Sequence, residues 1–489
     1  MAGLFANIQS IFAKTSNNWE KIAFGALKRR GEPLSLSKPL FMTYPEALSY
    51  LGEARRFGMK LGLEPMRELA DSLGNPQKKL RFIHLAGTNG KGSTAAFCES
   101  CLRAAGHRVG LYTSPHLVSV RERIQVDRNF ISQADFAEGM AIVRDKIGGL
   151  MDHESTFFEI TTALALWYFA REKVEWVVWE TGLGGRMDAT NIVQPEAVII
   201  TNVGLDHQRY LGESLREIAT EKAGIIKPGV PVISAVEPGE AAEVIRKQAK
   251  DKSCTLTMVH RDMEIEDLGL RGHKQIARID GRELTLSLLG PHQVYNAACA
   301  VEALRQLMES GAKLELSAVA IAHGLENTFW PGRFEILSEK PLMVLDGAHN
   351  PAGVAKLVEA WRGFLGARYG WKGQQAEGRA HLVFASVSDK DIAEMVRLLA
   401  PLARQVSLVR LVNERTAEPA ILAQSFSGLP CACYDSVKNL WHDISSMEGD
   451  IPIMITGSLF LVGEILAQRQ NNAEEHQLNE RLETFTVTR

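Results

Sequence analysis

The segment Gly87-Thr88-Asn89-Gly90-Lys91-Gly92-Ser93 constrains this chain most strongly, because it directly follows the apolar run Phe82–Ala86. A buried strand that ends in a glycine-rich turn can direct backbone N–H groups at an anion. Lys91 adds a positive charge, and Ser93 or Thr94 adds a hydroxyl that suits Mg²⁺. The segment therefore predicts a phosphate-binding loop for a nucleoside triphosphate, with an ordinary glycine turn as the alternative.

The loop departs from the common pattern G-x-x-x-x-G-K-[ST] in two ways. Gly92 separates Lys91 from the hydroxyl of Ser93, and Gly87 lies only three residues before Gly90. This departure indicates one subgroup of phosphate-loop proteins.

Length and composition indicate an ordinary globular enzyme. At 489 residues the chain exceeds what one hydrophobic core usually supports, so two domains are expected. It has 45% hydrophobic and 23% charged residues, and its net charge of -3 gives no reason to expect nucleic acid or a membrane as partner. No apolar stretch reaches the roughly 18 residues of a membrane helix, and residues 1–38 lack the apolar core of a signal peptide. We therefore expect a cytoplasmic protein.

The six cysteines are sparse for this length and suggest reduced, buried thiols. Cys98 with Cys101, and Cys431 with Cys433, have the spacing of half a metal site. Both pairs lack the second ligand pair that a zinc site needs.

Apolar runs alternate with helical segments, which is the pattern of a parallel sheet covered on both faces. The first expected strands are residues 82–86, 109–112, 176–180, 197–202 and 230–235. A second series is residues 342–346, 381–385, 405–409 and 452–455, with helices near 352–364, 392–400, 417–425 and 459–468. Between them, residues 255–289 predict small antiparallel strands and residues 296–309 a helix. The expected fold class is α/β: a phosphate-loop parallel-sheet domain with a small antiparallel subsheet, then a smaller Rossmann-like α/β domain.

We place the domain boundary near Asn327-Thr328-Phe329-Trp330-Pro331-Gly332, where an aromatic pair meets a Pro-Gly turn. The expected parts are an N-terminal arm at 1–40, the phosphate-loop domain at 41–328, the Rossmann-like domain at 329–468 and a polar tail at 469–489.

Several acidic and imidazole residues fall where expected strands end. Glu180 closes the strand at 176–180, at the edge where a parallel sheet opens its ligand crevice, and a carboxylate there suits Mg²⁺. Asp206-His207 lies just past the strand at 197–202, and Lys222 follows His207 by 15 residues. The alternatives are a surface glutamate, a structural histidine and a surface helix lysine.

These residues belong to a set of motifs that resembles the folylpolyglutamate synthase and dihydrofolate synthase group of the Mur ligase superfamily. The resemblance runs over residues 43–463, with its motifs in the family's order. The motifs are Ala86-Gly87-Thr88-Asn89-Gly90-Lys91-Gly92-Ser93, Tyr112-Thr113-Ser114-Pro115-His116-Leu117, Thr156-Phe157-Phe158-Glu159, Glu180-Thr181-Gly182-Leu183-Gly184-Gly185-Arg186-Met187-Asp188-Ala189-Thr190-Asn191, Asp206-His207, Glu221-Lys222-Ala223-Gly224-Ile225, Pro331-Gly332-Arg333 and Asp346-Gly347-Ala348-His349-Asn350-Pro351.

The resemblance implies two Mg²⁺ sites. Ser114 and Glu180 are expected to hold the Mg²⁺ that bridges the ATP phosphates, and His207 to help hold a second. Lys222 matches a lysine that carries a carbamate, a modification that turns an amine into an anion able to face a metal. K⁺ is a further candidate ion.

The resemblance also implies which residues bind ATP. Besides the loop from Gly87 to Ser93, these are Asn296, Arg333 and Asp346, although Arg333 could equally form an interdomain salt bridge. Lys91, His207 and Lys222 are the expected catalytic residues.

For the pterin-bearing substrate, the resemblance points to two short segments. These are Thr156-Phe157-Phe158-Glu159, which a buried helix start would also explain, and Met187-Asp188-Ala189. Ser114-Pro115-His116-Leu117 and the following Arg121-Glu122-Arg123 resemble a loop that closes over the site, and a solvated turn is the alternative for the three charged residues.

The implied chemistry is ATP-driven amide formation. A carboxylate of the acceptor takes the γ-phosphoryl group, and the amino group of L-glutamate then attacks the acyl phosphate. Dihydropteroate and the γ-linked tail of reduced folates are both possible acceptors, so a bifunctional enzyme, a tail-extending synthase and another Mur-type ligase stay open. A monomer that binds small molecules is expected. A GTPase-like switch is disfavoured because no N-K-x-D motif is present in the sequence.

Overall fold

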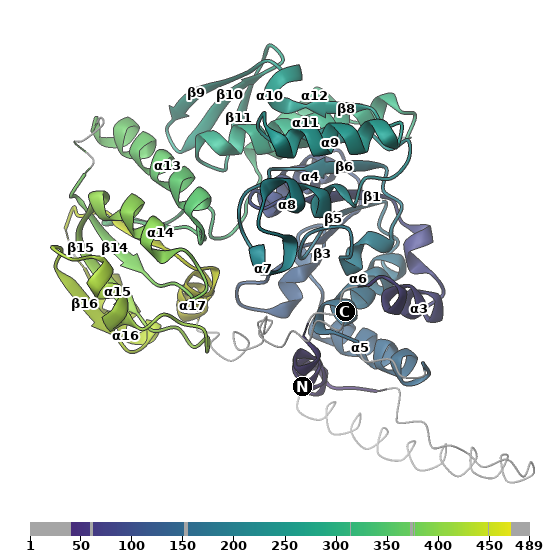
Figure 1. Ribbon diagram of the computed structural model, residues 1–489, viewed down its shortest axis with the longest axis horizontal. Helices are drawn as coiled ribbons and strands as arrows, with labels where there is room; N and C mark the ends of the chain where they lie inside the picture. Colours follow the sequence, from purple (N-terminus) through teal and green to yellow (C-terminus); the bar gives the residue numbers. More distant parts are fainter. Residues whose placement is uncertain are drawn as a thin grey trace, which may run out of the picture. The chain divides into compact units, whose positions relative to one another are not determined.

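The computed structural model describes residues 41–58, 62–150, 155–312, 314–371, 375, 377–447 and 449–470. These residues belong to one compact unit that begins at Phe41 (Figure 1). The predicted arm at 1–40 and residues 471–489 of the predicted tail lie outside the described residues.

An eight-stranded sheet forms the centre of the first part of the chain. Its order is β4-β3-β2-β5-β1-β6-β7-β8. The strands from β2 to β8 in this order are parallel, whereas β3 and β4 continue the sheet in antiparallel fashion. The bounds are β1 (Phe82–Ala86), β2 (Val109–Tyr112), β3 (Ile124–Val126), β4 (Asn129–Phe130), β5 (Trp176–Glu180), β6 (Ala197–Ile200), β7 (Val232–Ser234) and β8 (Leu256–Met258). All five strands predicted for this part are confirmed, with ends shifted by up to two residues.

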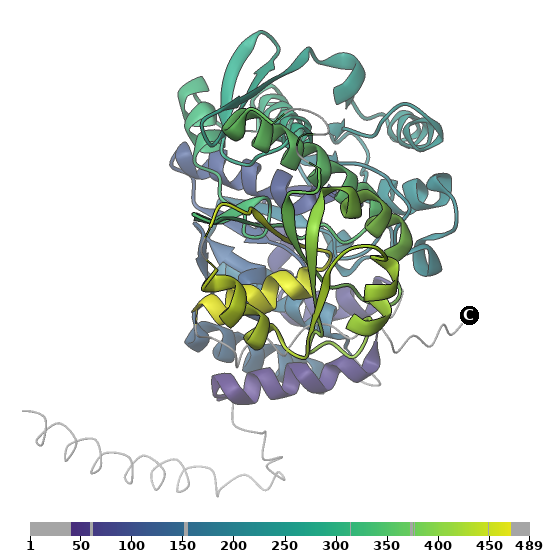
Figure 2. The same ribbon diagram turned by 90° about the vertical axis from the view of Figure 1, so that its left-hand side faces the viewer.

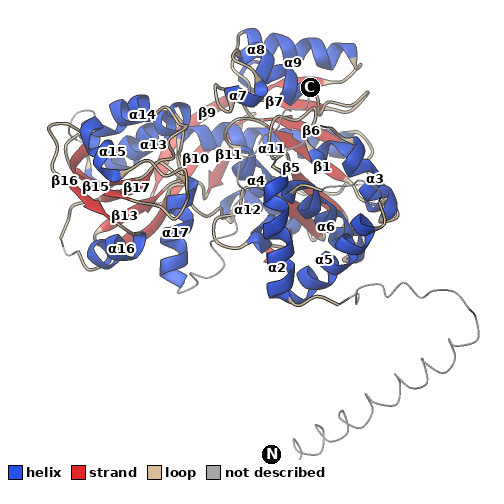
Figure 3. Cartoon of the chain, turned by 60° about the horizontal axis from the view of Figure 1, so that its bottom comes forward, coloured by secondary structure: helices blue, strands red, loops and turns tan. Residues whose placement is uncertain are grey.

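Both faces of this sheet are buried, which explains why its strands are continuous apolar runs. Successive residues of β1 point to opposite faces, so Ile83 and Leu85 join one core and Phe82 joins another. Helices α4 (Lys91–Ala104), α11 (Pro291–Glu309) and α12 (Ala318–Glu326) contribute to the first core. The second core takes side chains from α2 (Tyr44–Glu53), α3 (Glu64–Ser72), α5 (Gln133–Gly148) and α6 (Phe157–Arg171). Figure 3 shows these helices flanking the strands.

Towards β8, helices α8 (Leu215–Ala223) and α9 (Glu240–Asp251) form a further core with Val198 and Ile200 of β6. The predicted subsheet is present as the antiparallel strands β9 (Ile265–Arg271), β10 (Lys274–Ile279) and β11 (Arg282–Leu286). The prediction was wrong for the beginning of the segment 255–289, because β8 pairs in parallel with β7 and so belongs to the large sheet.

The second α/β part contains a six-stranded sheet of order β12-β13-β17-β14-β15-β16. Only its edge strand β12 is antiparallel to its neighbour. Figure 2 views this part with its strands between helices. The bounds are β12 (Glu335–Glu339), β13 (Leu342–Leu345), β14 (Ala380–Phe384), β15 (Ala403–Val409), β16 (Cys431–Tyr434), β17 (Ile453–Thr456), α13 (Pro351–Tyr369), α14 (Ile392–Leu399), α15 (Pro419–Ser425), α16 (Val437–Ser445) and α17 (Leu459–Gln470).

Shorter helical turns complete the described elements. They are α7 (Gln208–Leu211), α10 (Val259–Asp262) and the 3₁₀ turns at Ala54–Phe57, Pro76–Lys79, Val120–Arg123, Ala189–Ile192 and Ala400–Leu402. Among the described residues, no helix has the length and apolarity needed to cross a membrane.

The cysteines correct one expectation. Cys98, Cys101 and Cys299 are buried, as predicted, but Cys431 and Cys433 are exposed. Both lie on β16, and a strand at the edge of a sheet lacks a neighbour to cover it. No set of three side chains suited to holding a metal ion was found among the described histidine, cysteine and acidic residues, and Cys98 and Cys101 are free thiols.

Candidate active site

The strand order explains how distant sequence motifs meet. Strands β2, β5, β1 and β6 are consecutive neighbours and run in the same direction, so their carboxyl ends share one edge. Ser114 follows β2, Glu180 ends β5, the glycine-rich turn follows β1, and Asp206-His207 follows β6. Loops at such an edge form the usual ligand crevice of an open α/β sheet.

The glycine-rich turn lies so close to its neighbours that its glycines, among them Gly87 and Gly90, have no room for a side chain. A Cβ atom on Gly87 would lie 1.9 Å from Oγ1 of Thr201. Gly90 has a φ of 80°, and a Cβ there would lie 2.6 Å from Oδ1 of Asn296. The turn thus leads directly into the N-terminus of α4, where unpaired N–H groups favour an anion.

Side chains from the segment after β6 and from α11 hold this turn. Oδ1 of Asn202 accepts hydrogen bonds from the backbone N–H groups of Thr88 and Asn89, at 3.2 and 2.8 Å. Gln293 links α11 to the start of α4, because it accepts from Asn296 and donates to Ser93. The predicted residues Asn296 and Ser93 therefore lie together beside the turn.

Glu180 is a buried carboxylate beside two other predicted residues. Its Oε2 accepts the backbone N–H of Ser114 at 3.1 Å, and its Oε1 lies 3.9 Å from Nζ of Lys91. Lys91 also donates to the carbonyl of Gly87 at 3.1 Å. Burial raises the pKa of Glu180 to about 7, against the opposing effect of Lys91. A hard divalent cation would compensate this buried anion, so the Ser114–Glu180 pair fits Mg²⁺.

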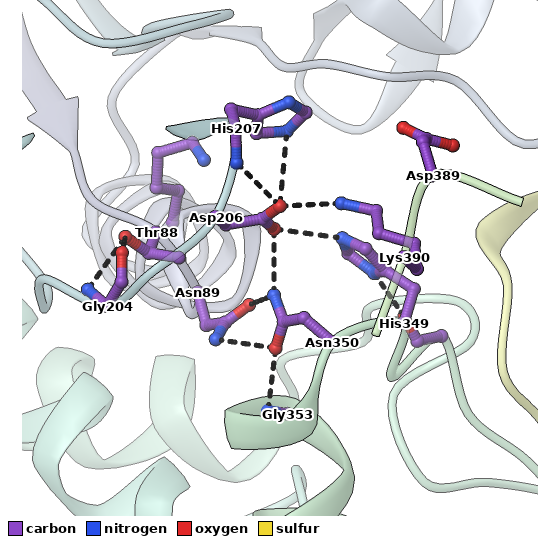
Figure 4. Close-up of polar contacts among 12 residues, drawn as sticks. Thr88, Asn89, Gly204, Asp206, His207, His349, Asn350, Gly353, Asp389 and Lys390 are labelled. Carbon is purple, nitrogen blue, oxygen red and sulfur yellow. Dashed lines mark hydrogen bonds and ion pairs between the residues drawn. The ribbon is translucent and has the colours of Figure 1, made fainter. Parts of the chain in front are cut away.

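Asp206 and His207 lie at the junction of the two α/β parts (Figure 4). Oδ1 of Asp206 accepts from Nζ of Lys390 at 2.6 Å and lies 4.0 Å from Nε2 of His207. Nε2 of His349 lies 3.9 Å from Oδ2 of the same carboxylate. Burial is the main reason that the pKa of His207 falls to about 4, so its imidazole is neutral, which is the form that binds metals.

Lys222 lies on α8 and is 3% exposed. Burial is the main cause that lowers its pKa to about 7, with Lys91 as a further cation that acts in the same direction. A neutral amine is nucleophilic towards CO₂, so a carbamate is chemically feasible here. Its surroundings also include the carboxylates of Asp188 and Asp206.

Arg333 and Asp346 are neighbours in the second part. The carboxylate of Asp346 accepts backbone N–H groups of Phe334 and Ala348, each at 2.8 Å. Arg333 is half-buried, donates to the carbonyl of Gly332 and has Asp346 and Glu180 as its nearby acidic groups. The charge of Glu180, which lies beside the phosphate loop, favours the cationic form of Arg333.

A cavity of about 320 Å³ opens beside these groups. It is lined by all seven residues predicted for the pterin-bearing substrate, namely Thr156, Phe157, Phe158, Glu159, Met187, Asp188 and Ala189. Ser114 and His207 also reach its wall, and His349, Lys390 and Arg415 line it from the second part. An apolar cavity that also contains a few polar groups is the usual form of a small-molecule site.

Local structure explains how the cavity wall is held. Thr156 caps α6, and it exchanges hydrogen bonds with Glu159 in a capping box. The ring of Phe158 lies against Gly182, where a Cβ would come within 2.6 Å of it. The buried-helix-start alternative therefore holds alongside cavity lining.

The loop after Ser114 differs from a solvated turn. Arg123 is fully buried, and its Nε donates to Nδ1 of His116 at 2.8 Å. Its guanidinium lies 5.2 Å from the ring centre of Phe157. Arg121 is half-buried and donates to the carbonyl of Ile131. Arg123 therefore packs against two residues of the cavity wall, His116 and Phe157.

The structure brings further residues to the site. Asp206, His349 and Asn350 occur in the motifs named above, but the sequence assigned them no role of their own, and it did not single out Asp389, Lys390 and Arg415. The run Ser388-Asp389-Lys390-Asp391 follows shortly after β14, and charged residues after a buried strand were the signal used for Glu180. The same signal could have found Lys390.

Taken together, a phosphate loop, a buried carboxylate next to it and cationic groups from a second α/β part are the layout of a nucleotide-dependent enzyme with two α/β domains. Two family models match this layout: the Mur ligase middle domain over residues 85–304, and the Mur ligase glutamate ligase domain over residues 332–459.

Relatives narrow the class. The chain is 36% identical over 436 residues to dihydrofolate synthase/folylpolyglutamate synthase of Bacillus subtilis, a match that covers 87% of this chain and 99% of that protein. It is 32% identical over 422 residues to the Escherichia coli enzyme of the same name, covering 86% and 94%. The chain therefore belongs to the folylpolyglutamate synthase/dihydrofolate synthase family of Mur ligases.

Solved structures agree with this assignment. The folylpolyglutamate synthase of Thermotoga maritima superposes with a TM-score of 0.76 at 33% identity, covering 88% of this chain and 98% of that one. E. coli FolC in complex with DHPP and ADP gives a TM-score of 0.76 at 30% identity, covering 89% and 99%.

Proposed function

We propose that this chain is an ATP-dependent ligase that adds L-glutamate to dihydropteroate and to the γ-glutamyl tail of reduced folates. The observation that carries the proposal is the position of the cavity. It extends from Ser114, whose backbone N–H is bound by Glu180 beside the phosphate loop, to Lys390 and Arg415 of the second part. Relatives named for both activities support a bifunctional enzyme.

The ion sites form part of the proposal. Ser114 and Glu180 would hold one Mg²⁺, and His207 with a carbamate on Lys222 would hold a second, with K⁺ as a further ion. Bound there, Mg²⁺ would neutralise phosphate charge and polarise the oxygens that react. The burial of Glu180 and Lys222, at 3% exposure each, supports these assignments because neither residue serves a solvated surface.

The chain's own residues would then act as follows. The loop from Gly87 to Ser93 binds the phosphates through the backbone N–H groups that Asn202 does not hold, and Lys91 offsets the negative charge that moves during phosphoryl transfer. Asn296, Arg333 and Asp346 bind the nucleotide from α11 and the second part. The seven predicted cavity residues hold the acceptor so that its carboxylate reaches the γ-phosphoryl group.

The second half-reaction needs a site for L-glutamate and protection from water. Lys390 and Arg415 supply positive charge for its carboxylates on the part of the cavity wall that comes from the second part of the chain. Its amino group attacks the acyl phosphate and phosphate leaves. A closed cavity keeps water from hydrolysing the mixed anhydride.

We also propose a cytoplasmic monomer whose partners are small molecules, without nucleic acid or membrane. The division of the chain at residues 328 and 329, with the ATP-binding domain before it and the ligase domain after it, is part of this proposal. Contacts of the first sheet end before this point and those of the second sheet begin at β12, which supports the division.

The test is incorporation of labelled L-glutamate by purified protein with ATP, using dihydropteroate and tetrahydrofolate in parallel and identifying products by mass. Product from both acceptors is expected. Product from tetrahydrofolate alone would leave the tail-extending synthase, and product from neither acceptor, with ADP released, would favour another Mur-type ligase. Lys91→Ala is the control, because it removes the loop's charge and should abolish ADP release.

A further inference from the structure

Asn350 makes an unusually complete set of hydrogen bonds where the two parts meet (Figure 4). It is 3% exposed and precedes α13, where its Oδ1 accepts the N–H of Gly353 at 2.8 Å. Oδ1 also accepts from Nδ2 of Asn89 at 3.2 Å. Its own Nδ2 donates to Oδ1 of Asn89 at 3.1 Å and to Oδ2 of Asp206 at 2.9 Å. Both donors and both acceptor positions of this amide are therefore used.

The network also determines which way the amide points. Gly353 offers only a backbone donor and Asp206 is an acceptor when ionised, so oxygen must face the helix and nitrogen the carboxylate. If the amide were flipped, its nitrogen would face two other donors and its oxygen would face two other acceptors. The orientation of Asn350 is therefore tied to the position of α13 relative to Asp206.

On the other side of the junction, Asn89 belongs to the phosphate loop itself. Its backbone N–H is held by Oδ1 of Asn202 at 2.8 Å, and its carbonyl accepts from Oγ1 of Thr201 at 2.6 Å. With its main chain bound to the two residues that follow β6, Asn89 directs its side chain to Asn350. The conformation of the loop therefore sets the position of the group that Asn350 must meet.

Asp206 adds a charged contact to the same junction. It accepts from Nζ of Lys390 at 2.6 Å, and both side chains are largely buried, at 9% and 12% exposure. It also accepts the backbone N–H of His207 at 2.8 Å. Lys390 and His349 line the cavity, so the contact that binds them to Asp206 also determines where they lie.

We propose that Asn350 is a positioning residue. Its hydrogen bonds to Asn89 couple the conformation of the phosphate loop to the position of the second domain, and so to the placement of His349 and Lys390 over the cavity. The proposal rests on the proposed ligase function. A buried amide whose hydrogen-bonding groups are left unpaired is unfavourable. Partial docking would leave several such groups, so the second domain docks fully only when the loop holds Asn89 in this orientation.

The test uses Asn350→Asp, which keeps a good helix cap and nearly the same shape. The new carboxylate cannot donate to Asp206 and repels it. We expect kcat/KM for L-glutamate to fall about 10- to 100-fold, as for the loss of a hydrogen bond to a charged group. Affinity for a non-hydrolysable ATP analogue, measured by calorimetry, should fall by a smaller factor, because the phosphate loop belongs to the first domain and only Arg333 and Asp346 come from the second.

Two further variants separate positioning from general destabilisation. Asn350→Asp combined with Asp206→Asn restores a donor and an acceptor with the charge exchanged, and should recover part of the lost kcat/KM. Asn439→Asp makes the same chemical change at an exposed position of α16 and should behave as wild type. Melting temperatures of all variants should agree if Asn350 acts through docking.

Small-angle X-ray scattering tests the inference without catalysis. With the ATP analogue bound, Asn350→Asp should have a larger radius of gyration than wild type, and the double variant a radius closer to wild type. Equal radii for wild type and Asn350→Asp would overturn the proposal, as would a double variant no better than the single one. If wild type incorporates no glutamate, the proposed function fails and the scattering comparison alone decides.

Discussion

Gly92 offers the sharpest test of how the phosphate loop is supported. A Cβ atom at this position would lie 2.7 Å from Nε1 of Trp330 and 3.0 Å from its Cε2. Arg128 lies 5.3 Å from the centre of the indole ring and is itself 3.8 Å from the buried carboxylate of Glu99, so moving the indole would disturb these contacts. Gly92→Ala should therefore displace the first turn of α4 as well as the indole.

The expected change in ATP-analogue affinity of Gly92→Ala follows from two opposing effects on stability. Overpacking of this kind costs about 1 to 3 kcal/mol. Alanine is intrinsically better than glycine in a helix by up to about 1 kcal/mol, and Gly92 is the second residue of α4. Helix propensity therefore favours the variant, and a loss can only come from the contact with Trp330. We expect affinity for a non-hydrolysable ATP analogue to fall about tenfold, which corresponds to about 1.4 kcal/mol.

Isothermal titration calorimetry with the analogue measures this effect. The control is a double-mutant cycle with Trp330→Leu, which removes the atoms that the new methyl group would meet. The two changes should be strongly non-additive, with most of the affinity restored in the double variant. Unchanged affinity in Gly92→Ala, or effects that add within about 0.5 kcal/mol, would refute the reasoning.

Three further predictions address other parts of the site and fold. Lys222→Ala should nearly abolish ligation. Carbon-13 NMR under labelled CO₂ should show a carbamate signal in wild type that the variant lacks. A wild-type spectrum without this signal would contradict the carbamate. Thr156→Ala removes the cap of α6 and should destabilise the protein by about 0.5 to 2 kcal/mol. The KM for the pterin acceptor should rise while the KM for ATP stays unchanged. Equal changes in both KM values would contradict a role of Thr156 in the cavity wall. Glu464 is 7% exposed, and burial raises its pKa from 4.5 to about 7, so the folded state binds its proton more tightly than the unfolded state. Its contribution is lost as pH rises from about 4.5 through about 7, at most about 3 kcal/mol. Glu464→Gln, whose carbonyl can still accept from Val412, should flatten melting temperature against pH in calorimetric scans, and an unchanged profile would reject the shift.

Residues that follow buried strands could be located from the sequence for a simple reason. A strand covered on both faces is an apolar run, so its end is visible, and parallel strands bring their ends to one edge. Glu180 and His207 were found in this way, and both lie at the expected edge. Strand β16 was missed because it is short and exposed, so burial imposes no apolar pattern on it.

Contacts across the junction could not be found by the same reasoning. Asn89 and Asn350 are 261 residues apart, and Asp206 and Lys390 are 184 apart. Residues of these types occur throughout the sequence, and whether two of them pair depends on how the two sheets dock. The spacing of residues within one sheet carries no information on that docking. Gly92 is a second example. The sequence shows an extra glycine after Lys91, but the indole of Trp330, which leaves no room for a side chain there, comes from the segment that joins the two sheets.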